Sequence, residues 1–277
     1  MKNSIESGTL YIVPTPIGNM EDITLRAKKV LEGVDFVAAE DTRVGGRLLE
    51  LLGIRKTLLP YHEHNKNRSG AAIAERLAGG QSCALITDAG TPAVSDPGQE
   101  LVRLCALEGI NVVPLPGACA AVCALSASGL KSARFAFEGF LPAGGSERRK
   151  RLEAVSREER TLIFYIAPHD LRRDLADLYA ALGERSAAVC RELTKLNEEI
   201  VRAPLSSLSE CGIAERGEFV LVVEGAPDRS ESWDGLDIVG HYEMYLDQGM
   251  PPMDAVKAVA ADRKLPKSEV YKHVKKK

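Results

Sequence analysis

The stretch LITDAGTPAVSDPG, residues 85–98, decides the fold, because a short buried strand ends there in a loop that suits a ligand. Residues 83–86 are apolar and predict the strand, and the next twelve residues contain two glycines, two prolines and two aspartates. Gly90 and Gly98 permit close approaches that a side chain would block, while the prolines stiffen the loop. Small molecules bind where the strands of α/β sheets end. The alternative is an ordinary loop that caps a helix expected from Pro97 onward.

Short apolar runs alternate with helical patterns on both sides of this loop, which is typical of a parallel sheet with crossover helices. In the first half, further strands are expected at residues 10–13, 36–39 and 112–115, and helices at 25–32, 45–52, 71–78 and 100–107. A helix of small residues follows at 118–128. The second half predicts strands at 135–140, 162–166, 187–191 and 219–224, with helices at 147–155 and 170–182.

A chain of 277 residues exceeds the usual size of a single core, so more than one domain is expected. The pattern predicts an N-terminal α/β domain over residues 1–117, a second α/β domain over 118–230, and a linker with a small helical unit over 231–277. Three short helical patterns in that last unit resemble a helix-turn-helix. The fold class is therefore α/β, with two α/β domains and a small C-terminal helical unit.

The formal net charge of −3 argues against a protein that coats nucleic acid indiscriminately. Positive charge is local instead, because residues 255–277 hold eight Lys or Arg and two acidic residues. Such a segment is expected of a protein that touches phosphate at one edge, although Lys275, Lys276 and Lys277 alone fit a solubilising tail.

The polar first residues and the lack of a run of roughly 20 apolar residues predict a soluble, cytoplasmic protein without a membrane anchor. The six cysteines form no CxxC pair, which suits reduced thiols. Cys119 and Cys123 share a helix face without a third ligand nearby, so no metal site is expected.

The loop after the first strand, PTPIGN at residues 14–19, differs from known phosphate-binding loops. The sequence contains neither G-x-G-x-x-G after this strand nor G-x-x-x-x-G-K-[ST]. Its two prolines also lack the N–H groups with which a backbone cradle binds phosphate. A ligand other than a pyrophosphate is therefore expected.

Five motifs occur in an order that resembles the tetrapyrrole methylase superfamily: VPTPIGN at 13–19, AEDTR at 39–43, DAGTP at 88–92, PG at 116–117 and RELTK at 191–195. Within it, EDTR at 40–43, YHEHN at 61–65, SDPG at 95–98 and GFLP at 139–142 are most similar to the ribosomal RNA small-subunit methyltransferase I family. The resemblance covers residues 9–226. It implies a homodimer that holds S-adenosylmethionine between two domains and methylates the 2′-hydroxyl of a decoding-centre cytidine in 16S rRNA.

The resemblance also implies which residues bind the cofactor. Gly90, Thr91 and Pro92 match the family's Gly-Asp-Pro, with Val94 and Ser95 beside them. The remaining matches are Pro14 and Ile17 in the first loop, Ala118, Cys119 and Ala120 after the Pro-Gly pair, Tyr165 and Ile166 at the end of a strand, and Ala226. Cys119 stands where the family often has serine, so a backbone contact is retained there while a hydroxyl contact is not.

A ribose hydroxyl is a weak nucleophile at neutral pH, so a positioned proton acceptor is expected. Lys195 is a candidate if burial near Arg191 lowers its pKa, and Glu192 and Glu40 are carboxylate candidates beside Glu199. For EDTR at 40–43, a helix N-cap with an internal ion pair is the alternative.

Candidate RNA contacts are Arg43, His62, His64 and the cluster Arg148, Arg149, Lys150 and Arg151. Four adjacent cations point several ways around a helix, so some of them face solvent whatever the function. For the two histidines, a plain surface loop is the alternative. Two other functions stay open: methylation of a tetrapyrrole carbon, and a non-catalytic RNA-binding assembly module.

Overall fold

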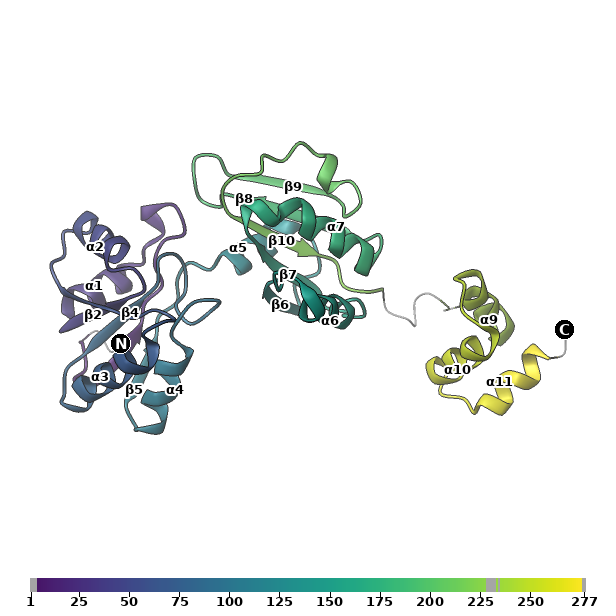
Figure 1. The fold of residues 1–277 in the computed structure, drawn as a ribbon, viewed down its shortest axis with the longest axis horizontal. Coiled ribbons are helices and arrows are strands. Elements are labelled where there is room, and N and C mark those ends of the chain that lie inside the picture. Colours follow the sequence, from purple (N-terminus) through teal and green to yellow (C-terminus); the bar gives the residue numbers. More distant parts are fainter. Residues whose placement is uncertain (1–3, 228–232, 234, 276–277) are drawn as a thin grey trace. The chain divides into compact units, whose positions relative to one another are not determined.

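The computed structural model describes residues 4–227, 233 and 235–275. By internal contacts these residues form two compact units, Met1–Ser156 with Arg160–Glu224, and Arg157–Glu159 with Gly225–Lys277. The larger unit contains two sheets (Figure 1). We call the part built on strands β1 to β5 the first lobe, and the part built on β6 to β10 the second lobe.

The sheet of the first lobe is parallel throughout and has the strand order β3-β2-β4-β1-β5. Its strands are β1 (Thr9–Ile12), β2 (Phe36–Ala39), β3 (Thr57–Pro60), β4 (Cys83–Ile86) and β5 (Asn111–Pro114). The helices between them are α1 (Leu25–Gly33), α2 (Thr42–Leu51), α3 (Lys66–Ala78) and α4 (Gln99–Leu107), and a short 3-10 helix covers Met20–Asp22.

Helices cover both faces of this sheet, because alternate residues of each central strand point to opposite sides. Val37 and Ile86 pack in one core with Leu31 of α1 and Leu49 of α2. Phe36 and Leu85 pack in the other core with residues of α3 and α4, among them Ile73 and Leu101. The carboxyl ends of the strands therefore form one open edge.

The sheet of the second lobe is mixed and has the strand order β6-β7-β10-β8-β9. Its strands are β6 (Phe135–Phe140), β7 (Thr161–Ile166), β8 (Ser186–Arg191), β9 (Glu199–Pro204) and β10 (Phe219–Val223). Only β6 and β7 run parallel; β10 lies antiparallel to both of its neighbours, β7 and β8. Helix α5 (Ala120–Ser128) packs on one face, and α6 (Gly145–Val155) and α7 (Leu171–Leu182) pack on the other. Short 3-10 helices cover Pro168–Asp170 and Leu208–Glu210.

The smaller unit has a core of its own between α9 (Ile238–Asp247), α10 (Pro252–Asp262) and α11 (Lys267–Val274). Val259 and Val270 are completely buried there. This confirms the three helices expected near the C-terminus. The limit at residue 230 and the residues Lys276 and Lys277 lie outside the described residues.

The α/β fold class is confirmed, and every predicted strand is present within one residue of its expected ends. Strands β3 and β9 were missed, and α3 begins at Lys66 rather than at residue 71. The helix expected from Pro97 begins at Gln99. The limits proposed for the three domains stay a prediction. In the described part of the chain, no helix combines the length and the apolar character needed to cross a membrane.

Candidate functional site

A cavity of about 410 Å³ is lined by loops at the ends of strands in both lobes. Such a volume falls within the range of small-molecule sites, about 300–1,000 Å³. The first lobe contributes the first loop, the start of the segment after β2 and the loop after β4. The second lobe contributes the ends of β6 and β7, the start of α5 and the start of β10. The residues that line the cavity include Ile17, Glu40, Asp88, Gly90, Thr91, Val94, Ser95, Asp96, Cys119, Ala120, Phe140, Tyr165, Ile166, Phe219 and Val220.

The loop after β4 is held in an unusual backbone conformation. Ala93 and Ser95 have positive φ angles of 66° and 61°, which non-glycine residues rarely adopt. Gly98 has φ 148°, and a Cβ atom there would lie 2.9 Å from the Cβ of Ala93. Gly90 pairs with Thr15 through two backbone hydrogen bonds of 2.9 and 3.0 Å. Backbone strain of this kind costs about 1–3 kcal/mol per residue and clusters at functional sites.

Direct contacts join the two lobes beside this cavity. A Cβ atom on Gly18 would lie 2.4 Å from Cγ of Lys195, so only glycine lets the first loop approach so closely. The backbone N–H of Asn19 donates a hydrogen bond of 3.1 Å to the Thr194 hydroxyl. The Thr91 hydroxyl donates to the carbonyl oxygen of Ala118 at 2.9 Å. The cavity is therefore bounded by contacts between elements far apart in the sequence.

Nine residues of the predicted cofactor set line the cavity: Ile17, Gly90, Thr91, Val94, Ser95, Cys119, Ala120, Tyr165 and Ile166. Three more, Pro14, Pro92 and Ala118, are not among the lining residues. A Cβ atom on Gly117 would lie 2.5 Å from the Cβ of Pro14, Pro92 is buried, and Ala118 accepts the bond from Thr91. That these residues bind a cofactor stays a prediction.

Ala226 is not among the residues that line this cavity, and its role in cofactor binding stays a prediction. Strand β10 is antiparallel to β7, so its first residue, Phe219, pairs with Ile166 at the cavity. Ala226 follows the opposite end of β10, and its N–H donates to the carbonyl oxygen of Glu158. The residues of this strand that do line the cavity, Phe219 and Val220, were missed.

Four carboxylates line the cavity, Glu40, Asp88, Asp96 and Glu218, and only Glu40 was a candidate. Glu40 accepts a hydrogen bond of 2.7 Å from the Thr87 hydroxyl. Burial, with the nearby charge of Glu40, raises the pKa of Asp96 to about 6. Burial also raises the pKa of Asp88, whose Oδ1 accepts from the backbone N–H of Asp41 at 3.2 Å. The motifs DAGTP and SDPG carry Asp88 and Asp96, so the signal was present in the sequence.

The pKa of Lys195 is not lowered, as its role as a proton acceptor would require, because two carboxylates bind its ammonium group. It donates to Glu192 Oε1 at 2.9 Å and to Glu218 Oε2 at 2.8 Å. Although burial acts in the opposite direction, these two bonds raise the pKa of Lys195. The Lys195 contact lowers the pKa of Glu192, which also accepts from the N–H of Glu218. Both residues are thus engaged in an ion pair, and their assignment as catalytic groups stays a prediction.

The alternative interpretation of EDTR at 40–43 is confirmed for two of its residues. Asp41 is the N-cap of α2 and accepts from the N–H of Arg43 at 2.8 Å. The same carboxylate binds the Arg43 guanidinium, and these bonds lower the pKa of Asp41 to about 2. Glu40 is free of this cap and lines the cavity, so it remains a candidate.

A second, more open cavity of about 690 Å³ adjoins the first. The two cavities share Ile17, Asp88, Ala89 and Glu218. Three cations line the second cavity: Arg43, Arg47 and Lys195. Leu48 and Leu51 of α2 add apolar surface, and the side chain of Leu51 is half exposed. Three carboxylates, Asp41, Asp88 and Glu218, line it as well, so this cavity combines apolar area with charge of both signs.

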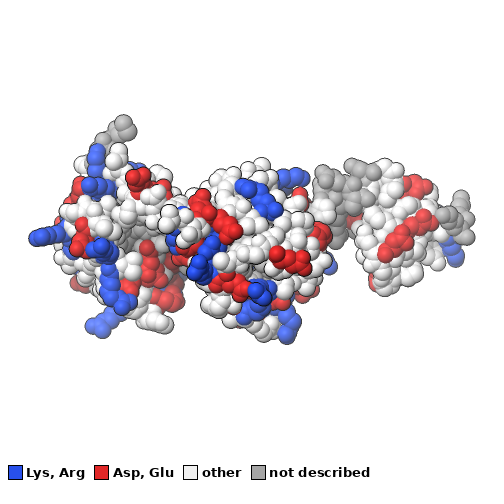
Figure 2. All heavy atoms as spheres, turned by 90° about the horizontal axis from the view of Figure 1, so that it is seen from above, with Lys and Arg blue, Asp and Glu red and all other residues white. Residues whose placement is uncertain are grey.

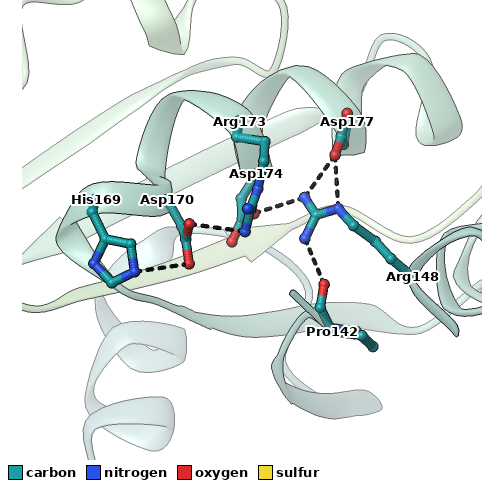
Figure 3. A network of polar contacts seen from close by, with 7 residues as sticks. All are labelled: Pro142, Arg148, His169, Asp170, Arg173, Asp174 and Asp177. Carbon is teal, nitrogen blue, oxygen red and sulfur yellow. Dashed lines mark hydrogen bonds and ion pairs between the residues drawn. The ribbon is translucent and has the colours of Figure 1, made fainter. Parts of the chain in front are cut away.

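Arg148 is buried, so the prediction that it contacts RNA is wrong (Figure 3). Its guanidinium donates to Asp174 at 2.7 Å, to Asp177 at 2.8 Å and to the carbonyl oxygen of Pro142 at 3.0 Å. These bonds raise the pKa of Arg148 against the effect of burial. The next three cations, Arg149, Lys150 and Arg151, are exposed, and Arg151 pairs with Glu138 at 3.2 Å.

His62 and His64 lie between β3 and α3 with their ring centroids 6.1 Å apart, and neither lines a described cavity. Figure 2 shows basic and acidic side chains interspersed on the visible face. Because the charges are mixed on this face, contact with a polyanion would depend on the three cations that line the second cavity. The assignments of Arg43, Arg149, Lys150, Arg151 and the two histidines to RNA stay predictions.

Comparison with known proteins identifies the family. A family model described as tetrapyrrole (corrin/porphyrin) methylases matches residues 9–209. The chain is 46% identical over 272 residues to a protein of Halalkalibacterium halodurans named ribosomal RNA small subunit methyltransferase I. The aligned region covers 96% of this chain and 94% of that protein. A protein of the same name from Bacillus subtilis is 45% identical over 273 residues, with the same coverage.

Among solved structures, uroporphyrin-III C-methyltransferase from Thermus thermophilus, complexed with S-adenyl homocysteine, is similar with a TM-score of 0.57. The match has 20% sequence identity and covers 78% of this chain and 97% of that one, so it supports the fold alone. The sequence relatives and the family model carry the conclusion further. The chain belongs to the tetrapyrrole methylase family and, within it, to the ribosomal RNA small subunit methyltransferase I group.

Proposed function

We propose that this methyltransferase transfers a methyl group from S-adenosylmethionine to the ribose 2′-hydroxyl of a cytidine in 16S rRNA of the small ribosomal subunit. The observation that carries the proposal is the pair of adjoining cavities, one apolar with carboxylates and the other lined by three cations and three carboxylates. The name of the sequence relatives supports ribosomal RNA as the substrate. The choice of ribose and cytidine and the homodimer rest on the resemblance described above, and the cytoplasmic location rests on the polar first residues and the lack of a long apolar run.

The first cavity fits S-adenosylmethionine by the chemistry of its lining. Ile17, Phe140 and Tyr165 offer apolar surface to an adenosyl group. Glu40, Asp88 and Asp96 offer negative charge to a ligand that carries a sulfonium and an ammonium group. When bound, the cofactor supplies an electrophilic methyl group.

The protein's own contribution is largely the alignment of two reactants. Holding a nucleophile and an electrophile in line is worth up to about 7–11 kcal/mol of the barrier. The strained loop after β4 and the contact of Gly18 with Lys195 fix the walls of the cavity before a ligand arrives. Preorganised walls lower the entropic cost of binding.

The second cavity is the proposed entry of the RNA. Arg43 lies there with 89% of its side chain exposed. We expect Arg43→Gln to weaken binding of 30S subunits and to reduce the slope of log K against log salt by about 0.7–0.9, the share of one phosphate contact. Filter binding at several salt concentrations measures this slope. Arg103→Gln, an exposed change on α4 outside both cavities, is the matched control and should leave the slope unchanged. Equal slopes for both variants would contradict the proposed entry.

The direct test of the function uses 30S subunits from a strain that lacks the corresponding methyltransferase. The protein is incubated with these subunits and methyl-labelled cofactor, and the modified nucleotide is mapped by nuclease digestion and mass spectrometry. The proposal expects one label on the ribose of a cytidine in 16S rRNA. Label on a base, on protein, or only on an added tetrapyrrole would refute it.

A further inference from the structure

Two titratable residues, Asp88 and Glu218, are among the four that line both cavities. The side chain of Glu218 is 70% exposed and its Oε2 is bound to the Lys195 ammonium at 2.8 Å. Asp88 is the second residue after β4 and belongs to neither ion pair of the second lobe. Its carboxylate therefore lies where a ligand of the first cavity and a ligand of the second would meet.

We propose that the Asp88 carboxylate accepts the proton of the attacking ribose hydroxyl. This inference rests on the function proposed above and names a residue of the same site. The ribose oxygen forms a bond to the methyl carbon while the carbon–sulfur bond breaks with its electron pair on sulfur, which loses its positive charge. The hydroxyl proton passes to Asp88, so that charge and atoms balance and no further reactant is needed.

The orientation of Asp88 is fixed by the start of α2. Asp88 Oδ1 accepts from the N–H of Asp41 at 3.2 Å. Asp41 is itself fixed, since its carboxylate accepts from the backbone N–H of Arg43 at 2.8 Å and from the Arg43 side chain at 3.0 Å. The motifs EDTR and DAGTP, 47 residues apart, thus act together to hold one carboxylate.

The charges around Asp88 favour its role as an acceptor. Burial raises its pKa, and Glu40 and Asp41 raise it further, while the Asp41 N–H and the Arg43 charge oppose them. A carboxylate with a raised pKa takes a proton more readily than an ordinary one. Other charged groups that line the same two cavities are Asp96, Arg47, Lys195 and Glu218.

Asp96 provides a matched comparison, because it is an aspartate of the same loop that lines the first cavity and not the second. Asp88→Asn and Asp96→Asn each replace a carboxylate by an amide of the same shape. For Asp88→Asn we expect single-turnover methylation of 30S subunits, at saturating cofactor, to slow by about 100- to 10,000-fold. Its affinity for 30S subunits should not fall, since the change removes a negative charge. For Asp96→Asn we expect weaker cofactor binding in calorimetry and a much smaller loss of rate at saturation than for Asp88→Asn.

The pH dependence separates proton acceptance from a structural role. The carboxylate must be ionised to act, so the wild-type rate should fall as the pH falls through the raised pKa of Asp88. Asp88→Asn should lose this limb of the profile, and Asp88→Glu, which keeps a carboxylate, should retain it at a reduced rate. Calorimetry with the cofactor and circular dichroism establish that each variant is folded and loaded.

Three outcomes overturn the inference: a normal rate for Asp88→Asn, an unchanged pH profile for that variant, or a loss of rate in Asp96→Asn alone. They differ from a failure of the proposed function, in which the wild-type protein places no methyl group on ribose. In that case the role of Asp88 fails as well.

Discussion

Arg148→Ala should destabilise the protein by about 3–5 kcal/mol, because the buried carboxylate of Asp174 then keeps only its longer contact with Arg173, at 3.5 Å. The side chains of Arg148 and Asp174 are only 7% and 4% exposed, and the arginine also binds Asp177 and the carbonyl oxygen of Pro142 (Figure 3). Urea unfolding of the variant and of the wild-type protein measures the loss, as a shift of the midpoint at an unchanged m-value.

Two variants test the cause of this loss. Arg149→Ala removes the neighbouring, exposed cation, and we expect a change within about 0.5 kcal/mol. The double change Arg148→Met with Asp174→Leu removes both buried charges and should recover much of the stability. If Arg148→Ala and Arg149→Ala unfold at the same urea concentration, the buried ion pair is not the determinant.

Thr91→Trp should raise the dissociation constant for S-adenosylmethionine by about 100-fold or more, a loss of about 2.7 kcal/mol or more. Thr91 lines the first cavity, and its hydroxyl is bound to Ala118, so an indole ring at this position fills space that the ligand needs. Isothermal titration calorimetry measures the affinity. The thermal shift that the cofactor gives the wild-type protein should also disappear.

The control for this variant places the same ring at Leu196, which is fully exposed and lines neither cavity. Leu196→Trp should bind the cofactor as the wild-type protein does. Normal affinity in Thr91→Trp would show that the ligand binds elsewhere.

The central strands could be predicted from the sequence because they are buried on both faces. Phe36–Ala39 is apolar throughout and lies where it was expected. Strands β3 and β9 lie at the edges of their sheets and contain exposed positions, so neither has a continuous apolar run. Short strands with exposed positions give little signal in a single sequence, although β5 and β6, which also lie at sheet edges, were predicted.

The site was predictable where its residues lie in one continuous segment, as in the loop from Gly90 to Ser95. It was not predictable where distant segments meet. Which of four adjacent cations turns inward depends on Asp174, 26 residues further along the chain. The direction of β10 places its first residues, rather than its last, at the cavity. This direction depends on strand pairing that no local pattern reveals.

The three C-terminal helices enclose their own buried valines, apart from the cores of the two sheets. A polypeptide with separate cores melts in more than one cooperative step, and each step reports only the part that opens. A calorimetric scan of this chain is therefore a superposition of transitions. Arg148→Ala, which breaks the buried ion pair of the second lobe, would shift the transition of the sheets and leave the transition of the three C-terminal helices in place.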